Sequence, residues 1–104
     1  MNIDPGAFIN EQIRATRALI KFWEDHGSDP GRAVRDCLNF LEHNNIVQAV
    51  KAYQQVPLGG MGCLNDWYPT PIEPYETAEY AYAVMNALIS HWSSLMQLSV
   101  NARQ

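Results

Sequence analysis

The chain has 104 residues, of which 47% are apolar, and its formal net charge is −4. A domain of this size buries about 60 to 65% of its unfolded surface without disulfides or metals. No apolar run approaches the roughly 18 residues that a membrane-spanning helix needs, and the N-terminal sequence lacks the basic and hydrophobic regions of a signal peptide. We therefore expect one cytoplasmic domain over residues 1–104, without a membrane span.

The first predicted helix covers residues 5–26. Asp4 can cap it, and Pro5 suits the first helical turn, where a missing N–H needs no partner. Apolar residues then recur at spacings of three and four, which is typical of the buried stripe of an amphipathic helix. Gly27 can adopt the left-handed conformation that ends many helices.

Two shorter helices are predicted next. Residues 30–43 repeat the same opening, with Ser28 or Asp29 as the cap and Pro30 in the first turn, and end before a pair of asparagines. Residues 45–56 place apolar side chains on one face and stop before a proline, which cannot continue a helix.

The last predicted helix, residues 76–102, is the longest. Thr77 can cap it, or Pro74 can start it one turn earlier. We predict that its buried side is the spine for the other three helices and consists of Ala81, Val84, Met85, Leu88, Trp92, Leu95 and Leu98. The sequence shows no strand-like alternation, so the predicted fold is all-α, a compact bundle of about four helices.

The loop between the third and fourth predicted helices, residues 57–76, holds four of the six prolines and three of the six glycines. It is nevertheless rich in aliphatic and aromatic residues, whereas a flexible linker would be polar. Structured loops of this length are uncommon and often functional. We therefore expect the loop to pack in a defined way, with structural roles for Gly59, Gly60, Gly62 and Asn65.

The sequence LGGMGCLNDWYP, Leu58 to Pro69, resembles the GGMG-x-x-ND signature of a family of small bacterial helical proteins of unknown function. In that family a serine is frequent where this chain has Cys63, so no role that requires a hydroxyl there is carried over. The resemblance implies a bacterial, non-secreted, all-helical protein. It also suggests similarity to immunity proteins, which bind a toxin and block its active site.

No catalytic or metal-binding constellation can be recognised in the sequence. His26 and His43 lie near predicted helix ends, where surface positions are common, and His91 borders the apolar stripe of the last helix. Cys37 and Cys63 form no metal motif and are expected to be reduced thiols. The loop glycines lack the preceding strand and the lysine of a phosphate-binding loop. We therefore predict a protein that is not an enzyme and uses no cofactor or metal.

The charges indicate the kind of partner. Every lysine and arginine except Arg103 lies between Arg14 and Lys51, whereas residues 52–102 contain four carboxylates and no basic side chain. Nucleic-acid binding needs clustered basic residues, so a basic protein partner is favoured instead. Tyrosine and tryptophan anchor interfaces and carboxylates steer basic partners. The predicted partner-binding residues are Asp66, Trp67, Tyr68, Glu73, Tyr75, Glu76, Glu79 and Tyr82.

The predicted function is therefore non-enzymatic protein binding, most specifically that of a bacterial immunity protein or antitoxin that neutralises a basic toxin domain. The protein itself is expected to be a monomer or a homodimer. Two alternatives remain open. One is a small-ligand-binding or catalytic domain that uses the 57–76 loop as a lid over Asp66, His91 and Cys63. The other is a homo-oligomeric structural module in which the loop forms the contact between copies.

Overall fold

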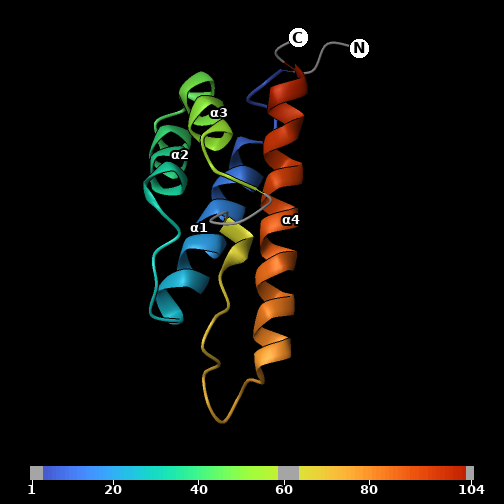
Figure 1. Cartoon of the computed structure of the whole chain (residues 1–104). Helices are drawn as coiled ribbons and strands as arrows, with labels where there is room; N and C mark the ends of the chain where they lie inside the picture. Colours follow the sequence, from blue (N-terminus) through green and yellow to red (C-terminus); the bar gives the residue numbers. More distant parts are fainter. Residues whose placement is uncertain (1–3, 59–63, 103–104) are drawn as a thin grey trace.

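The structure is a computed structural model that describes residues 4–58 and 64–102. These ranges contain four α-helices and a short 3₁₀ turn at Leu64–Asp66, and they contain no strand. The helices are α1 (Ile9–Asp25), α2 (Arg32–Glu42), α3 (Ile46–Gln54) and α4 (Ala78–Ala102). The predicted all-α bundle of four helices is confirmed (Figure 1).

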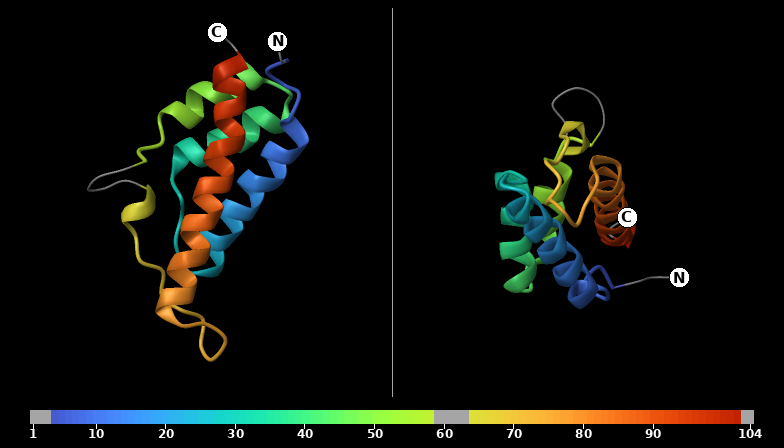
Figure 2. Two further views of the ribbon diagram at one scale, coloured as in Figure 1. Left: turned by 90° about the vertical axis from the view of Figure 1, so that its right-hand side faces the viewer. Right: turned by 90° about the horizontal axis from the view of Figure 1, so that it is seen from below.

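The two long helices, α1 and α4, pack against each other, and α3 also contacts α4. Helix α2 joins the bundle chiefly through α1 and α3. The last helix was predicted to pack against all three others, but α4 packs mainly against α1 and α3. The described residues nearest the two chain ends lie at one end of the molecule (Figures 1 and 2). The segment that leads into α4 turns at the opposite end.

One hydrophobic cluster of the described residues fills the space between the helices. Its largest fully buried side chains include Trp92, Leu19, Leu41, Met85 and Met96. Tyr53 meets Trp92 edge-on, with 5.1 Å between ring centroids, which is a favourable arrangement for two aromatic rings. All four helices thus contribute buried residues to the core.

The buried side of α4 is rotated relative to the predicted one. Leu98 was predicted to be buried, but it is 39% exposed. Apolar residues occupy so many positions of this helix that periodicity alone leaves its rotation open. Polar contacts with α1 help to set it, since the buried Ser99 accepts a hydrogen bond from Nε2 of Gln12 at 2.7 Å. The residues of α4 that are buried are Ala81, Met85, Ile89, Trp92, Met96 and Ser99.

Helix α1 begins at Ile9, four residues after the predicted start. Oδ1 of Asp4 accepts the N–H of Gly6 at 2.9 Å, so the aspartate forms a local turn instead of capping the helix. The predicted end is confirmed, because Gly27 has a φ of 75° and the N–H of the following Ser28 bonds the carbonyl of Trp23 at 2.8 Å.

Helix α2 begins at Arg32, and Pro30 therefore lies before the helix and not in its first turn. Oδ1 of Asp29 accepts the N–H of Gly31 at 2.7 Å, and Gly31 has a φ of 106°. A positive φ at this position interrupts the helix that the proline would otherwise start. At the other end, Asn44 has a φ of 56° and ends the helix as predicted.

The ends of the last two helices follow from their caps. Oδ1 of Asn45 accepts the N–H of Gln48 at 3.3 Å at the start of α3. Helix α3 ends at Gln54, two residues before the predicted end. At the start of α4, Oγ1 of Thr77 accepts the N–H of Tyr80 at 3.1 Å. Thr77 is thus the cap, and a start at the earlier proline is wrong.

Gly31→Ala will destabilise the protein more than Gly27→Ala. A Cβ atom at either position meets nothing within 4 Å, so the difference arises from the backbone alone. Gly27 lies in the left-handed helical region, where alanine costs about 1 kcal/mol. Gly31, with φ 106° and ψ 162°, lies in a region that is essentially restricted to glycine, and the expected cost is about 2 to 3 kcal/mol. Urea denaturation of both variants measures the difference, and equal losses would contradict it.

Candidate functional site

An extended segment links the 3₁₀ turn to α4, and we call its residues 67–77 the strap (Figure 1). Trp67 anchors the start of the strap. Its ring lies 5.1 Å from that of Trp23 and 6.5 Å from that of Phe22, both on α1. Leu64, just before the strap, is buried in the core. Leu64 and Trp67 are therefore packed on the helices, and Trp67 is turned toward α1. The prediction of a packed loop is wrong for its other large apolar residues, because Leu58, Tyr68, Ile72 and Tyr75 are exposed.

The far end of the strap is joined to the C-terminal end of α1 by His26 and Glu76, a contact that we call the latch. Nε2 of His26 lies 2.8 Å from Oε1 of Glu76, and Nδ1 lies 2.7 Å from the carbonyl oxygen of Phe22. The side chains of His26 and Glu76 are 3% and 15% exposed. His26 is thus buried, contrary to the surface position expected for it. Glu76 is committed to a contact within the molecule, so we leave it out of the partner surface.

The surroundings of Glu76 affect its ionisation. Its Oε1 also accepts the N–H of Ile72 at 2.9 Å. This backbone hydrogen bond, followed by the one with His26, lowers the pKa of Glu76 below its ordinary value of 4.5. A carboxyl whose pKa is lower in the folded than in the unfolded chain stabilises the fold above its unfolded pKa. That contribution is lost as the pH falls through the lowered pKa.

The outer side of the strap and the start of α4 expose tyrosine rings. Tyr75, Tyr68 and Tyr80 are 86%, 72% and 60% exposed. Tyr68 stacks on Tyr82, with 4.7 Å between centroids and 15° between ring planes. The hydrogen bond with Tyr82 raises the pKa of Tyr68. The predictions missed Tyr80, because no sequence signal separates it from its half-buried neighbour Tyr82.

The same segments also expose carboxylates. Glu73 and Glu79 are exposed, and neither belongs to an ion pair between described residues. Glu79 precedes Tyr82 by three residues, so the two share one side of α4. Asp66 is also exposed, and its charge contributes to the raised pKa of Tyr68. We call this set the acidic tyrosine surface: Asp66, Tyr68, Glu73, Tyr75, Glu79 and Tyr82.

The carboxylates of α1, α2 and the turn between them are neutralised locally. On α1, α2 and the turn between them, acidic and basic side chains pair with one another along the surface. The pairs are Glu11–Arg14, Arg17–Glu42, Lys21–Asp25, Arg32–Asp36, and Arg35 with both Glu24 and Asp29. Residues 52–102, by contrast, contain no lysine or arginine. The exposed carboxylates of the strap and of the start of α4 therefore have no basic residue close to them in the sequence.

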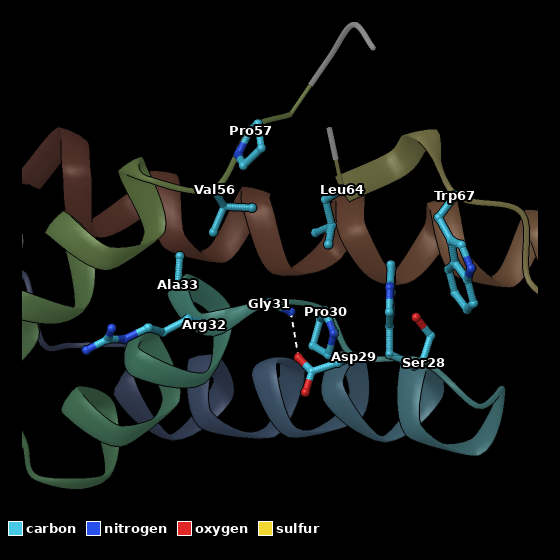
Figure 3. A pocket seen from close by; sticks show the side chains of 11 residues that line it. Ser28, Asp29, Pro30, Gly31, Arg32, Ala33, Val56, Pro57, Leu64 and Trp67 are labelled. Atoms are coloured by element: carbon cyan, nitrogen blue, oxygen red, sulfur yellow. Dashed lines mark hydrogen bonds between the residues drawn. The ribbon is translucent and has the colours of Figure 1, made fainter. Parts of the chain in front are cut away.

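A groove of about 420 Å³ lies between the α1–α2 turn, the end of α3 and the 3₁₀ turn (Figure 3). Val56 and Leu64 project toward Pro30 across it, and Trp67 stands at one end. Its lining is mixed, because Ser28 and Asp29 also contribute. Neither Asp66 nor His91 lines it, so it is not the site that the lid alternative required.

The residues considered for catalysis do not form a cluster in the described part of the chain. His43 and His91 are exposed, and Cys63 lies outside the described residues. No group of three histidine, cysteine, aspartate or glutamate side chains there is arranged to hold a metal. Cys37 is a free thiol in the core, and burial raises its pKa to about 12, which makes it unreactive.

The predicted structural roles of Gly59, Gly60 and Gly62 also fall outside the described residues. Asn65 is described only through its backbone, which forms the middle of the 3₁₀ turn. No helix among the residues described is both long and apolar enough to cross a membrane.

Comparison with known proteins gives no family. No protein-family model matches the chain, and searches of curated proteins and of solved structures found no significant match. The resemblance of residues 58–69 to the bacterial helical family therefore stays a prediction. What the chain does has to be inferred from the acidic tyrosine surface and the elements that position it.

Proposed function

We propose that this chain is a non-enzymatic protein-binding module that uses the acidic tyrosine surface to bind a basic protein. The observation that carries the proposal is the combination of exposed tyrosine rings and exposed carboxylates on a segment that is anchored near both ends. Trp67 anchors one end through Trp23, and Glu76 anchors the other through His26.

The anchoring makes the surface suitable for binding. A segment that is already ordered loses little conformational freedom when a partner docks, so more of the contact energy appears as affinity. Tyrosine supplies a large, rigid contact area and is enriched among residues that dominate interfaces. Tyr75 and Tyr68 are the most exposed large hydrophobic side chains described, so they are the natural anchors.

The charge pattern supports a basic partner of a particular kind. Carboxylates on one side of an interface accelerate encounter with a positively charged surface and disfavour acidic partners. A nuclease presents such a surface, because its substrate site must attract phosphates. We therefore propose specifically that the chain is a bacterial immunity protein or antitoxin that neutralises a basic toxin domain. The resemblance of residues 58–69 agrees with this proposal.

The test is co-expression with the product of the neighbouring reading frame, followed by purification and calorimetric titration. Glu73→Lys combined with Glu79→Lys should weaken binding by about 100-fold, because two attractive charges become repulsive. Both side chains are exposed, so the fold should be unaffected. Glu76 is left unchanged because it belongs to the latch.

The matched control is Glu11→Lys combined with Glu42→Lys, which makes the same change of net charge at exposed positions of α1 and α2 away from the strap and the latch. It should change the affinity by less than about threefold, since exposed ion pairs contribute little. Equal weakening by both double variants would contradict the location of the surface. A purified protein that retains a small molecule and no protein partner would instead favour ligand binding in the groove.

A further inference from the structure

We propose that the latch makes the acidic tyrosine surface pH-responsive: the strap is held against α1 while His26 carries its second proton and is released when that proton is lost. This inference deepens the proposed function, on which its biological meaning rests. Its physical content concerns the chain alone.

The two ring nitrogens of His26 face groups that can only accept hydrogen bonds. Nδ1 lies 2.7 Å from the backbone carbonyl of Phe22, and Nε2 lies 2.8 Å from the carboxylate of Glu76. Neither an ionised carboxylate nor a carbonyl has a proton to give. Both contacts are therefore hydrogen bonds only when each nitrogen carries a proton, as in the imidazolium ion.

Neutral histidine does not fit this arrangement. With its proton on Nδ1, the ring turns a lone pair toward the carboxylate of Glu76; with its proton on Nε2, it turns one toward the carbonyl of Phe22. Either tautomer places two acceptors within hydrogen-bonding distance in a site where the side chain of His26 is 3% exposed. Little water can reach the unpaired groups there, so their mutual repulsion is not relieved.

The site also suits a cation in other respects. His26 is the C-terminal cap residue of α1, where the helix dipole favours positive charge. Its ring lies over that of Phe22, with 4.0 Å between centroids, so a positive ring faces an aromatic π system. The charge of Glu76 completes the pair. These contacts all weaken or disappear when His26 becomes neutral.

The other charged groups nearby are already engaged or turned to solvent. On α1 and in the turn after it, the neighbouring carboxylates bind lysine or arginine: Glu24 and Asp29 both pair with Arg35, and Asp25 pairs with Lys21. The strap and the first turn of α4 each carry one further carboxylate, Glu73 and Glu79, and both are exposed. Glu76 is the one ion-pair partner of His26 among the described residues.

The latch controls a compact part of the strap. The N–H groups of Tyr75 and Glu76 both bond the carbonyl of Ile72 at 3.0 Å, and Oε1 of Glu76 returns to the N–H of Ile72. Residues 72–76 thus form a closed turn. Among the described residues, the hydrogen bond between His26 and Glu76 connects this turn to α1. Its loss would free Tyr75 and Glu73 together.

The experiment is an NMR titration of the isolated chain from about pH 5.5 to about pH 8.5, a range in which histidine charge commonly changes. The ring signals of His26 and the backbone order parameters of residues 72–76 are followed in the same samples. As His26 loses its proton, the order parameters should fall from about 0.85 to below about 0.6. A strap that stays ordered throughout the range overturns the proposal.

Two variants identify the groups responsible. In Glu76→Gln the amide can donate to an unprotonated Nε2 of His26 while its oxygen accepts from Ile72, so the strap should stay ordered at every pH. His43→Asn combined with His91→Asn removes the two exposed histidines and should leave the response intact. A response that persists in the first variant, or disappears in the second, overturns the proposal. Since no partner is present, this result is independent of the binding test above.

Discussion

Trp92→Ala is expected to lower the free energy of unfolding by about 3 to 5 kcal/mol, as is usual when a large buried aromatic side chain is removed. Trp92 is fully buried near the middle of α4 and meets Tyr53 edge-on. The total stability of a domain of this size is about 5 to 15 kcal/mol. The substitution should therefore bring the protein close to unfolding. Urea denaturation followed by circular dichroism measures the loss.

Trp92→Phe is the informative control. The indole Nε1 of Trp92 is buried and has no hydrogen-bond partner among the described residues, so phenylalanine removes an unsatisfied donor while it keeps an aromatic ring. Its cost should be below about 1.5 kcal/mol. A cost of Trp92→Phe close to that of Trp92→Ala would contradict this expectation.

Trp67→Ala should detach the start of the strap without unfolding the helices. Trp67 is only half-buried, but its ring packs on Trp23 and Phe22 of α1. The expected loss is about 2 to 3 kcal/mol, below that for a fully buried tryptophan. Helix content measured by circular dichroism should stay unchanged, while the unfolding midpoint in urea falls.

Tyr75→Ala is the comparison for that experiment, because it removes an aromatic ring of the same strap that is 86% exposed. Replacing an exposed side chain of this kind usually changes the free energy of unfolding by no more than about 0.5 kcal/mol. If the two variants lost similar stability, Trp67 could not be the anchor of the strap. If Tyr75→Ala weakened partner binding without changing stability, it would separate the binding role of Tyr75 from the anchoring role of Trp67.

The helices could be predicted from the sequence because apolar spacing and helix-ending residues act locally. Gly27 and Asn44 end α1 and α2 as expected, since the left-handed conformation that each adopts is a property of the residue type. The starts were less predictable. Asp4 and Asp29 each bond the N–H of a glycine two residues later, and this turn competes with the cap that the same aspartate could form.

The site was predictable in composition but not in orientation. The sequence identified a loop rich in carboxylates and aromatic rings, and Tyr68, Tyr75 and Glu73 are indeed exposed. It could not show that Trp67 packs on α1 or that Glu76 binds His26, which is 50 residues away along the chain. Such pairings depend on how the helices meet. The same tertiary contacts decide which side of α4 is buried.

The strap turns at the end of the bundle opposite to the described residues nearest both chain termini (Figures 1 and 2). Helix α4, Ala78–Ala102, spans about 37 Å at 1.5 Å per residue, and this length separates the end of the strap from residue 102. An affinity handle, a fluorescent protein or a sensor chip attached at either terminus would therefore leave that surface facing outward. The chain can be immobilised or fused to another domain without covering the part that we propose to bind its partner.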